Sequence, residues 1–214
     1  QDVALEFASA LGLQPEPPDW HLPLPDAAVT RARELIPDGV RALVVSPCSS
    51  HPLRNWSIER YAAVVAHAVQ ERGMRVILCT APSATEMAVA AEIERRCGVP
   101  VMNLAGRDTL PELLALLKRA TALLTPDSGP AHIGTLAGVP VIGLYACTRS
   151  ARTGPYRSRD YCVDRYAEAA RRFRDCEPEQ LKWTADIEAP GAMDLIEVDD
   201  VLGRLSAILE QHLS

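Results

Sequence analysis

The feature that most constrains the fold is a regular alternation of two apolar patterns between residues 41 and 145. Short runs of consecutive apolar residues, typical of buried strands, alternate with longer segments whose apolar residues recur at helical spacing. The strand-like runs fall at residues 42–46, 75–79, 101–104, 122–125 and 139–145. Strands that alternate with helices build a parallel sheet covered on both faces. The sequence therefore predicts an α/β domain, a Rossmann-like three-layer fold around a parallel sheet with right-handed crossovers.

The segments on either side of this alternation are less regular. Residues 1–11 carry apolar side chains on one helical face, and the proline-rich stretch at 14–25 is typical of an extended linker. A short helix is expected over 26–36. Beyond the last strand we expect a loop at 147–160, a helix at about 166–173, an irregular segment at 175–196 and a closing helix from Val198 onward.

The composition excludes several classes of protein. The 214 residues carry a formal net charge of −6, whereas nucleic-acid binding needs a dense basic face. The six cysteines show no CxxC pairing, so we expect reduced, mostly buried thiols in a cytoplasmic protein, and neither a disulfide framework nor a metal site. No apolar run approaches the roughly 20 residues of a membrane-spanning helix, and we find no secretory signal. The start at Gln1, without Met, indicates a processed or truncated chain.

The octapeptide TPDSGPAH at residues 125–132 directly follows the fourth strand-like run. Pro130 suits the first turn of a helix, and Asp127 or Ser128 can cap it. A strand that turns at once into a helix places free backbone N–H groups at the carboxyl edge of the sheet, where the helix dipole favours an anion. The octapeptide therefore has two interpretations, a helix cap alone or a phosphate-binding turn.

The loop after the first strand-like run, residues 46–56, bears on this choice. In an open parallel sheet, ligands bind at the carboxyl ends of the strands where the strand order reverses. If the first and fourth strands are neighbours there, Ser49, Ser50 and Arg54 lie beside the octapeptide and together suit a diphosphate. A polar turn with a solvated Arg54 is the alternative. Neither GxGxxG nor GxxxxGK[ST] occurs at any expected strand–helix junction, which argues against dinucleotide and P-loop sites.

Four short motifs occur together in this chain: Ser49-Ser50, the Arg54-x-Trp56 spacing, the octapeptide and Thr153-Gly154-Pro155. Between about residues 41 and 156 the chain thereby resembles the heptosyltransferase-like enzymes of glycosyltransferase family nine. The resemblance implies the C-terminal domain of a GT-B fold, which has two Rossmann-like domains and binds the nucleotide sugar in the second. It also implies the following division. Residues 1–25 end the N-terminal domain and form the interdomain linker, 26–196 form the donor-binding domain and 197–214 form the closing helix.

The resemblance implies a role for each matching residue. Asp127 and Arg54 are expected to be catalytic. Asp127 would contact the donor sugar or diphosphate, and Arg54 stands where the family usually has a lysine that contacts the donor phosphates. The residues expected to bind the donor diphosphate are Ser49, Ser50, Arg54, Ser128, Gly129 and His132.

The nucleoside is expected beside the loops that follow the second and third strands. Ser83 and Glu86 lie nearest to the place where the family has a ribose-binding carboxylate, and Asp108 is expected to line the base through its main chain. The arginines of the 147–160 loop have two interpretations: they face a phosphorylated acceptor, or they are solvated, and the second is slightly favoured. These arginines are Arg149, Arg152 and Arg157.

The implied reaction is inverting, metal-independent sugar transfer from a nucleoside diphosphate sugar, such as an ADP-heptose-like donor, to a lipopolysaccharide-type acceptor, without a cofactor. The implied partners are the nucleotide sugar and a saccharide or lipid-linked saccharide, with peripheral association at the cytoplasmic face of the inner membrane. The acceptor base is expected on the N-terminal domain. Two alternatives stay open: a nucleotide-sugar-binding module without catalysis, and a GT-B-like sugar-nucleotide epimerase.

Overall fold

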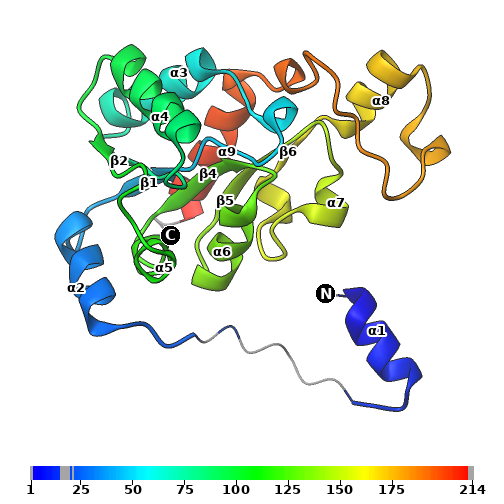
Figure 1. Cartoon of the computed structure of the whole chain (residues 1–214), viewed down its shortest axis with the longest axis horizontal. Helices are drawn as coiled ribbons and strands as arrows, with labels where there is room; N and C mark the ends of the chain where they lie inside the picture. The colour runs from blue at the N-terminus through cyan, green and yellow to red at the C-terminus, as the bar shows by residue number, and fades with distance from the viewer. Residues whose placement is uncertain (1, 15–19, 21, 212–214) are drawn as a thin grey trace.

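The computed structural model describes residues 2–14, 20 and 22–211 of the chain. In that part, the strands are β1 (Ala42–Val45), β2 (Arg75–Leu78), β3 (Met102–Asn103), β4 (Ala122–Pro126), β5 (Val141–Tyr145) and β6 (Val163–Asp164) (Figure 1). The α-helices are α1 (Asp2–Ala10), α2 (Asp26–Leu35), α3 (Ile58–Gln70), α4 (Ala84–Cys97), α5 (Leu110–Leu117), α6 (Gly129–Ala137), α7 (Ser150–Thr153), α8 (Tyr166–Arg174) and α9 (Val198–Gln211). Short 3-10 turns are η1 (Pro52–Arg54), η2 (Arg159–Tyr161), η3 (Pro178–Gln180) and η4 (Met193–Leu195).

The strands of the described residues form one parallel sheet in the order β3-β2-β1-β4-β5-β6. Strand β1 pairs with β2 on one side and with β4 on the other, so the strand order reverses between β1 and β4. The register aligns Val45 with Leu78 and with Leu124, which brings the carboxyl ends of the three central strands to one edge. The predicted neighbourhood of the first and fourth strands is therefore confirmed.

Both faces of the sheet are covered by helices. Leu43 and Val45 of β1 pack toward α3, α4 and α9, while Ala42 and Val44 pack toward α5 and α6. All four side chains of β1 are buried, which explains why this strand is apolar at every position instead of alternating. Figure 1 shows α3 and α4 on one side of the strands and α5 and α6 on the other. The predicted three-layer α/β fold is confirmed.

Local capping sets the bounds of the helices. Ser57 and Ser83 precede α3 and α4, and each hydroxyl accepts a hydrogen bond from the backbone N–H three residues later. Gly98 ends α4 at a φ of 65°, a left-handed conformation that glycine adopts without strain. A capping box between Thr109 and Glu112 starts α5. These signals explain why the predicted bounds of α4 match the structure.

Two predictions outside the alternation need correction. The segment at 147–160, expected as a loop, contains α7 and the start of η2. A sixth strand, β6, pairs with β5 but was missed, because two residues with one exposed side chain give no apolar run. The predicted first helix is present as α1, whereas half of the predicted linker, 15–19 and 21, lies outside the described residues.

Two further observations concern burial and membrane crossing. Trp56 is buried, and its Nε1 donates to the carbonyl of Ile196 at 2.9 Å. This bond ties the loop after β1 to the segment that precedes α9. No described helix has the length and apolar character that crossing a bilayer would take.

Candidate functional site

The β4–α6 turn lies where the strand order reverses. Ser128 is the N-cap residue of α6 with an extended backbone, φ −156° and ψ 167°. Within the described part of the chain its side chain makes no capping bond, and its hydroxyl lies 2.8 Å from Oγ1 of Thr125 instead. Ser128 therefore occupies the expected N-cap position, but the expected capping hydrogen bond from its side chain is not made among the described contacts. A Cβ placed on Gly129 would meet nothing within 4 Å, so the space before the first turn of α6 is open.

Asp127 is held from several sides. Its side chain is 9% exposed, and one carboxylate oxygen accepts from Thr148 Oγ1 at 2.8 Å and from the Arg54 guanidinium at 3.2 Å. Its backbone carbonyl accepts from the Ser49 hydroxyl at 2.8 Å. Because these partners follow β1 and β5, the network joins loops from three neighbouring strands at one point.

The guanidinium of Arg54 contacts three carboxylates. Besides Asp127, its Nε donates to Glu188 at 2.9 Å, and one terminal nitrogen lies 3.1 Å from Asp186 and 2.8 Å from Glu188. The Arg54 side chain is 23% exposed. All three guanidinium nitrogens therefore have acidic partners within the protein itself, so the alternative of a solvated Arg54 is wrong.

Two further basic side chains border this network. Nε2 of His51 lies 3.2 Å from Glu188, and the Arg152 guanidinium pairs with Asp186. We call the set formed by His51, Arg54, Asp127, Arg152, Asp186 and Glu188 the arginine–carboxylate cluster. Buried Cys147 lies beside it, with Sγ 3.2 Å from the carbonyl of Leu53. Burial raises the pKa of the Cys147 thiol to about 11, and the negative charge of Glu188 adds to the shift.

Asp186 and Glu188 were missed at the level of sequence. They lie in the irregular segment at 175–196, where no periodic pattern identifies an element, and they contact Arg54 across 132 and 134 residues of chain. The only local signal is a pair of acidic residues two positions apart.

The arginines of the 147–160 segment need a corrected description. Arg149 donates to the carbonyl of Pro178 and lies 4.3 Å over the Tyr166 ring, while Arg152 pairs with Asp186 and donates to the carbonyl of Thr184. The favoured interpretation of solvated side chains is therefore wrong for these two. Arg157 is exposed.

The predicted diphosphate-binding residues come together at this edge but differ in what they offer. The N–H of Ser49 donates to Asn55 Oδ1 at 2.6 Å and its hydroxyl to Asp127, so both of its donors are used within the protein. Ser50 and His132 are exposed at the same edge, His132 in the first half of α6. In the first turn of α6, Pro130 has no backbone N–H, and the N–H of Ala131 donates to the carbonyl of Ser128 at 3.1 Å.

A cavity of about 220 Å³ lies next to this turn, between the loops after β1, β2 and β3. Its lining is mostly apolar, with four polar residues, Ser46, Thr80, Asp108 and Thr109, and it includes Cys79, Pro130 and Ile133. Pro130 and Ile133 belong to α6, so the same helix borders both the cavity and the open space before its N-terminus.

The three residues predicted for the nucleoside differ in position. Asp108 lines this cavity, whereas Ser83 and Glu86 do not. The Ser83 hydroxyl accepts from the N–H of Glu86 at 3.2 Å, and the Glu86 carboxylate accepts from the N–H of Ala81 at 3.1 Å. Both side chains thus stabilise the start of α4. Burial raises the pKa of Asp108 to about 6, and its own backbone N–H acts in the opposite direction.

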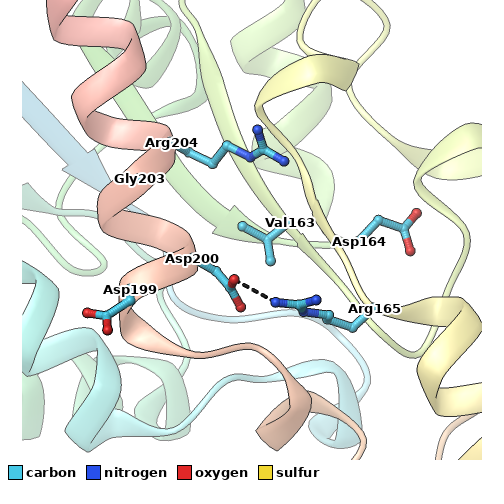
Figure 2. A pocket seen from close by; sticks show the side chains of 7 residues that line it. All are labelled: Val163, Asp164, Arg165, Asp199, Asp200, Gly203 and Arg204. Atoms are coloured by element: carbon cyan, nitrogen blue, oxygen red, sulfur yellow. Dashed lines mark hydrogen bonds and ion pairs between the residues drawn. The ribbon is translucent and has the colours of Figure 1, made fainter.

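A second, more polar cavity of about 450 Å³ lies between β6 and α9, away from the predicted site residues. Figure 2 shows its lining, with the Asp200 carboxylate turned toward the Arg165 guanidinium at 2.6 Å. The residues that line it are Val163, Asp164, Arg165, Asp199, Asp200, Gly203 and Arg204.

Comparison with known sequences gives two kinds of match. The model of a family described as glycosyltransferase family 9 (heptosyltransferase) matches residues 2–182. The lipopolysaccharide core heptosyltransferase OpsX of Haemophilus influenzae is 34% identical over 207 residues, which are 97% of this chain and 59% of that protein. Lipopolysaccharide heptosyltransferase 3 of Escherichia coli K12 is 36% identical over 119 residues, 54% of this chain and 34% of that protein. The chain thus spans less than two thirds of the length of these relatives.

Comparison with solved structures concerns the fold. The glycosyltransferase family 9 protein of Veillonella parvula has a TM-score of 0.75 at 20% identity, covering 98% of this chain and 60% of that one. The ADP-heptose lps heptosyltransferase II of E. coli has a TM-score of 0.68 at 20% identity, covering 94% and 56%. E. coli heptosyltransferase WaaC, solved with ADP, has a TM-score of 0.59 at 17% identity, covering 94% and 54%. These likenesses agree with the expected GT-B-type domain.

Proposed function

This chain belongs to glycosyltransferase family 9, and we propose that it is the donor-binding half of a lipopolysaccharide heptosyltransferase. The observation that carries the proposal is the convergence of the loops after β1 and β4 at the reversal of strand order, beside the cavity lined by Asp108. The proposed donor is ADP-heptose, because one structural neighbour is described as an ADP-heptose heptosyltransferase and another was solved with ADP.

We place the diphosphate in the open space before α6. Gly129 carries no side chain there, and the N-terminal end of the helix, which includes the backbone N–H of Gly129, carries a partial positive charge. Ser50 and His132 are exposed at the same edge and supply side-chain donors. The base then occupies the neighbouring cavity, so one nucleotide spans both features along α6.

Arg54 would stabilise the negative charge that grows on the departing diphosphate. The proposal requires phosphate oxygens to share or replace the contacts that Asp186 and Glu188 make with its guanidinium. Asp127 would keep its place beside Arg54, where its carboxylate can accept a hydrogen bond from a hydroxyl of the donor sugar.

In the proposed inverting reaction, the acceptor hydroxyl oxygen forms a bond to the anomeric carbon while the bond from that carbon to the diphosphate oxygen breaks. The hydroxyl proton passes to a base that we place outside the described residues, and no metal ion or cofactor takes part. The proposed acceptor is a lipopolysaccharide-type saccharide or its lipid-linked precursor. The proposed location is the cytoplasm, in peripheral contact with the inner membrane.

Two alternatives make different predictions. A binding module would hold ADP-heptose without transferring the sugar, and an epimerase would isomerise the donor in the absence of an acceptor. We propose incubating the purified chain with ADP-heptose, with and without heptose-deficient lipopolysaccharide, while calorimetry measures ADP binding. ADP binding, and transfer when the chain is combined with the missing acceptor half, would support the proposal. No binding of ADP, or isomerisation of the donor alone, would contradict it.

A further inference from the structure

A third cavity, of about 360 Å³, lies between the C-terminal end of α8 and the chain that follows it. Four of its lining residues carry hydrogen-bond donors in their side chains, and two of these, Arg174 and Lys182, are cations. The other two are Gln180 and Thr184. Among the described residues that line the cavity, Asp186 is the single acid. This set of side chains suits an anionic ligand.

The two cations of this cavity are available to a ligand. Arg174 and Lys182 are exposed, and neither forms an ion pair with a carboxylate of the described residues. Arg174 donates to the backbone carbonyl of Asp186 at 3.4 Å instead. Arg171 on the same helix differs, because its guanidinium lies 2.9 Å from the carboxylate of Glu177. The positive charge of Arg174 and Lys182 is therefore not compensated by a direct contact.

The acid in the lining is paired with cations of the arginine–carboxylate cluster. One carboxylate oxygen of Asp186 accepts from the Arg54 guanidinium at 3.1 Å, and the other accepts from Arg152. Because both oxygens are engaged in this way, Asp186 repels an anion in the cavity less than a free carboxylate would. Arg174 and Lys182 therefore determine the sign of the charge that the cavity attracts.

The position of the cavity indicates where the anion comes from. Asp186 lines the cavity and contacts Arg54, so the cavity directly adjoins the place where we expect the diphosphate to depart. The diphosphate has its own cation there, and the other substrate of the proposed reaction is the acceptor saccharide. A phosphate monoester on that saccharide carries a charge of about −1.5 to −2 near pH 7 and three acceptor oxygens, which match the donors of the cavity.

We propose that this cavity binds a phosphate group carried by the acceptor saccharide, with Arg174 and Lys182 as its main contacts. This inference rests on the proposed function and extends it, since it assigns part of acceptor recognition to the donor-binding half. Arg149 and Arg152, the loop arginines considered for such a group from the sequence, are engaged within the protein. Arg174 and Lys182 act in acceptor binding and take no part in the transfer step.

The test measures heptose transfer from ADP-heptose by the complete two-domain enzyme. The acceptor is a deacylated, heptose-deficient oligosaccharide, used before and after its phosphate groups are removed with a phosphatase. In the wild type, KM should be about tenfold lower for the phosphorylated acceptor, the typical effect of one hydrogen bond between charged groups. Arg174→Ala combined with Lys182→Ala should raise that KM about tenfold and leave kcat unchanged. The KM of the dephosphorylated acceptor should not change, which also shows that the double variant is folded.

Two further variants serve as controls. Arg171→Ala removes a cation of the same helix that does not line the cavity, so it should retain the preference for the phosphorylated acceptor. Arg174→Lys keeps the positive charge and should retain most of that preference.

Three results would overturn the role of the cavity and leave the proposed function standing. They are an equal KM for the two acceptors in the wild type, an equal rise of both KM values in the double variant, and the same loss of preference in Arg171→Ala. Inorganic phosphate and phosphatidylglycerol vesicles test other sources of the phosphate group. If the wild type binds either one, the double variant does not, and the two acceptors have equal KM values, the proposal is also overturned. A wild-type enzyme that transfers heptose to neither acceptor would overturn the proposed function and this inference with it.

Discussion

The arginine–carboxylate cluster and the cavity lined by Asp108 lie at the same sheet edge and differ in how their polar groups are satisfied. In the cluster, Arg54 pairs with Asp127, which follows β4, and with Asp186 and Glu188 of one irregular segment. In the cavity, a carboxylate oxygen of Asp108 has no partner within the described residues. A paired network fixes side chains before a ligand arrives, whereas an unpaired buried group depends on the ligand. The cluster can therefore hold its side chains in place before a ligand arrives, whereas the unpaired oxygen of Asp108 gains a partner only when a ligand binds.

Removing the shared cation should give the largest effect. Arg54→Ala removes the guanidinium that the three carboxylates share and leaves Arg152 paired with Asp186 alone, and the diphosphate loses a stabilising charge in the transition state. We expect transfer by the complete two-domain enzyme to fall by about 10²–10³-fold, as for loss of one oxyanion donor. Steady-state kinetics with ADP-heptose checks this, and Arg54→Lys should recover part of the rate. Unchanged turnover in Arg54→Ala would remove Arg54 from the reaction.

Removing one carboxylate from the cluster should have a smaller effect, and it should increase the affinity for ADP. Glu188→Gln keeps an acceptor for the Arg54 Nε but deletes a negative charge beside the proposed diphosphate position. We expect ADP to bind about three- to tenfold more tightly at low salt, with the gain shrinking as ionic strength rises. Calorimetry at two salt concentrations measures it. Weaker binding would instead mean that Glu188 chiefly holds Arg54 in position.

The unpaired carboxyl group of the cavity should make stability depend on pH. Since the pKa of Asp108 is about 6 in the folded chain and near 4 when unfolded, the folded state binds more protons between these values. Stability from this group is therefore present below about pH 4 and lost as the pH rises to about 6. This loss of unfolding free energy should be on the order of 1 kcal/mol, because the side chain is partly exposed. Asp108→Asn, which cannot titrate, should abolish it. Thermal unfolding at pH 4 and pH 7 tests this, and an unchanged pH profile would refute it.

The smallest effect concerns the N-caps of α3 and α4. Ser83→Ala and Ser57→Ala each remove one N-cap hydroxyl, so both should lower the free energy of unfolding by about 1 kcal/mol. Because Ser83 does not line the cavity, ADP affinity should stay the same in both variants. A loss of affinity in Ser83→Ala alone would reinstate the predicted ribose contact.

The parts of the fold that follow from local physics could be predicted from the sequence. The bounds of α4 follow from its cap at Ser83 and the left-handed Gly98, and the other five strands follow from apolar runs between helical stripes. Strand β6 was missed because Val163 and the exposed Asp164 form no apolar run. The cap expected at Ser128 is absent from the described contacts, since its hydroxyl pairs with Thr125.

The sequence predicted where the candidate site lies in the fold, but it did not predict all the residues that contact one another there. Arg54 and Asp127 were expected near one another, because both follow strands that meet at the reversal of strand order, and they do form an ion pair. Asp186 and Glu188 come from an irregular segment more than a hundred residues away, and no local pattern reveals such contacts. These long-range contacts depend on tertiary packing alone.

Hydrogen–deuterium exchange of the chain with and without ADP tests the central claim most directly, because it locates the nucleotide without assuming any residue role. We predict slower exchange at residues 46–57, 105–109 and 127–132, with no change at the β6–α9 cavity shown in Figure 2. Protection confined to residues 163–165 and 199–204 would contradict the account, and so would exchange that ADP leaves unchanged throughout.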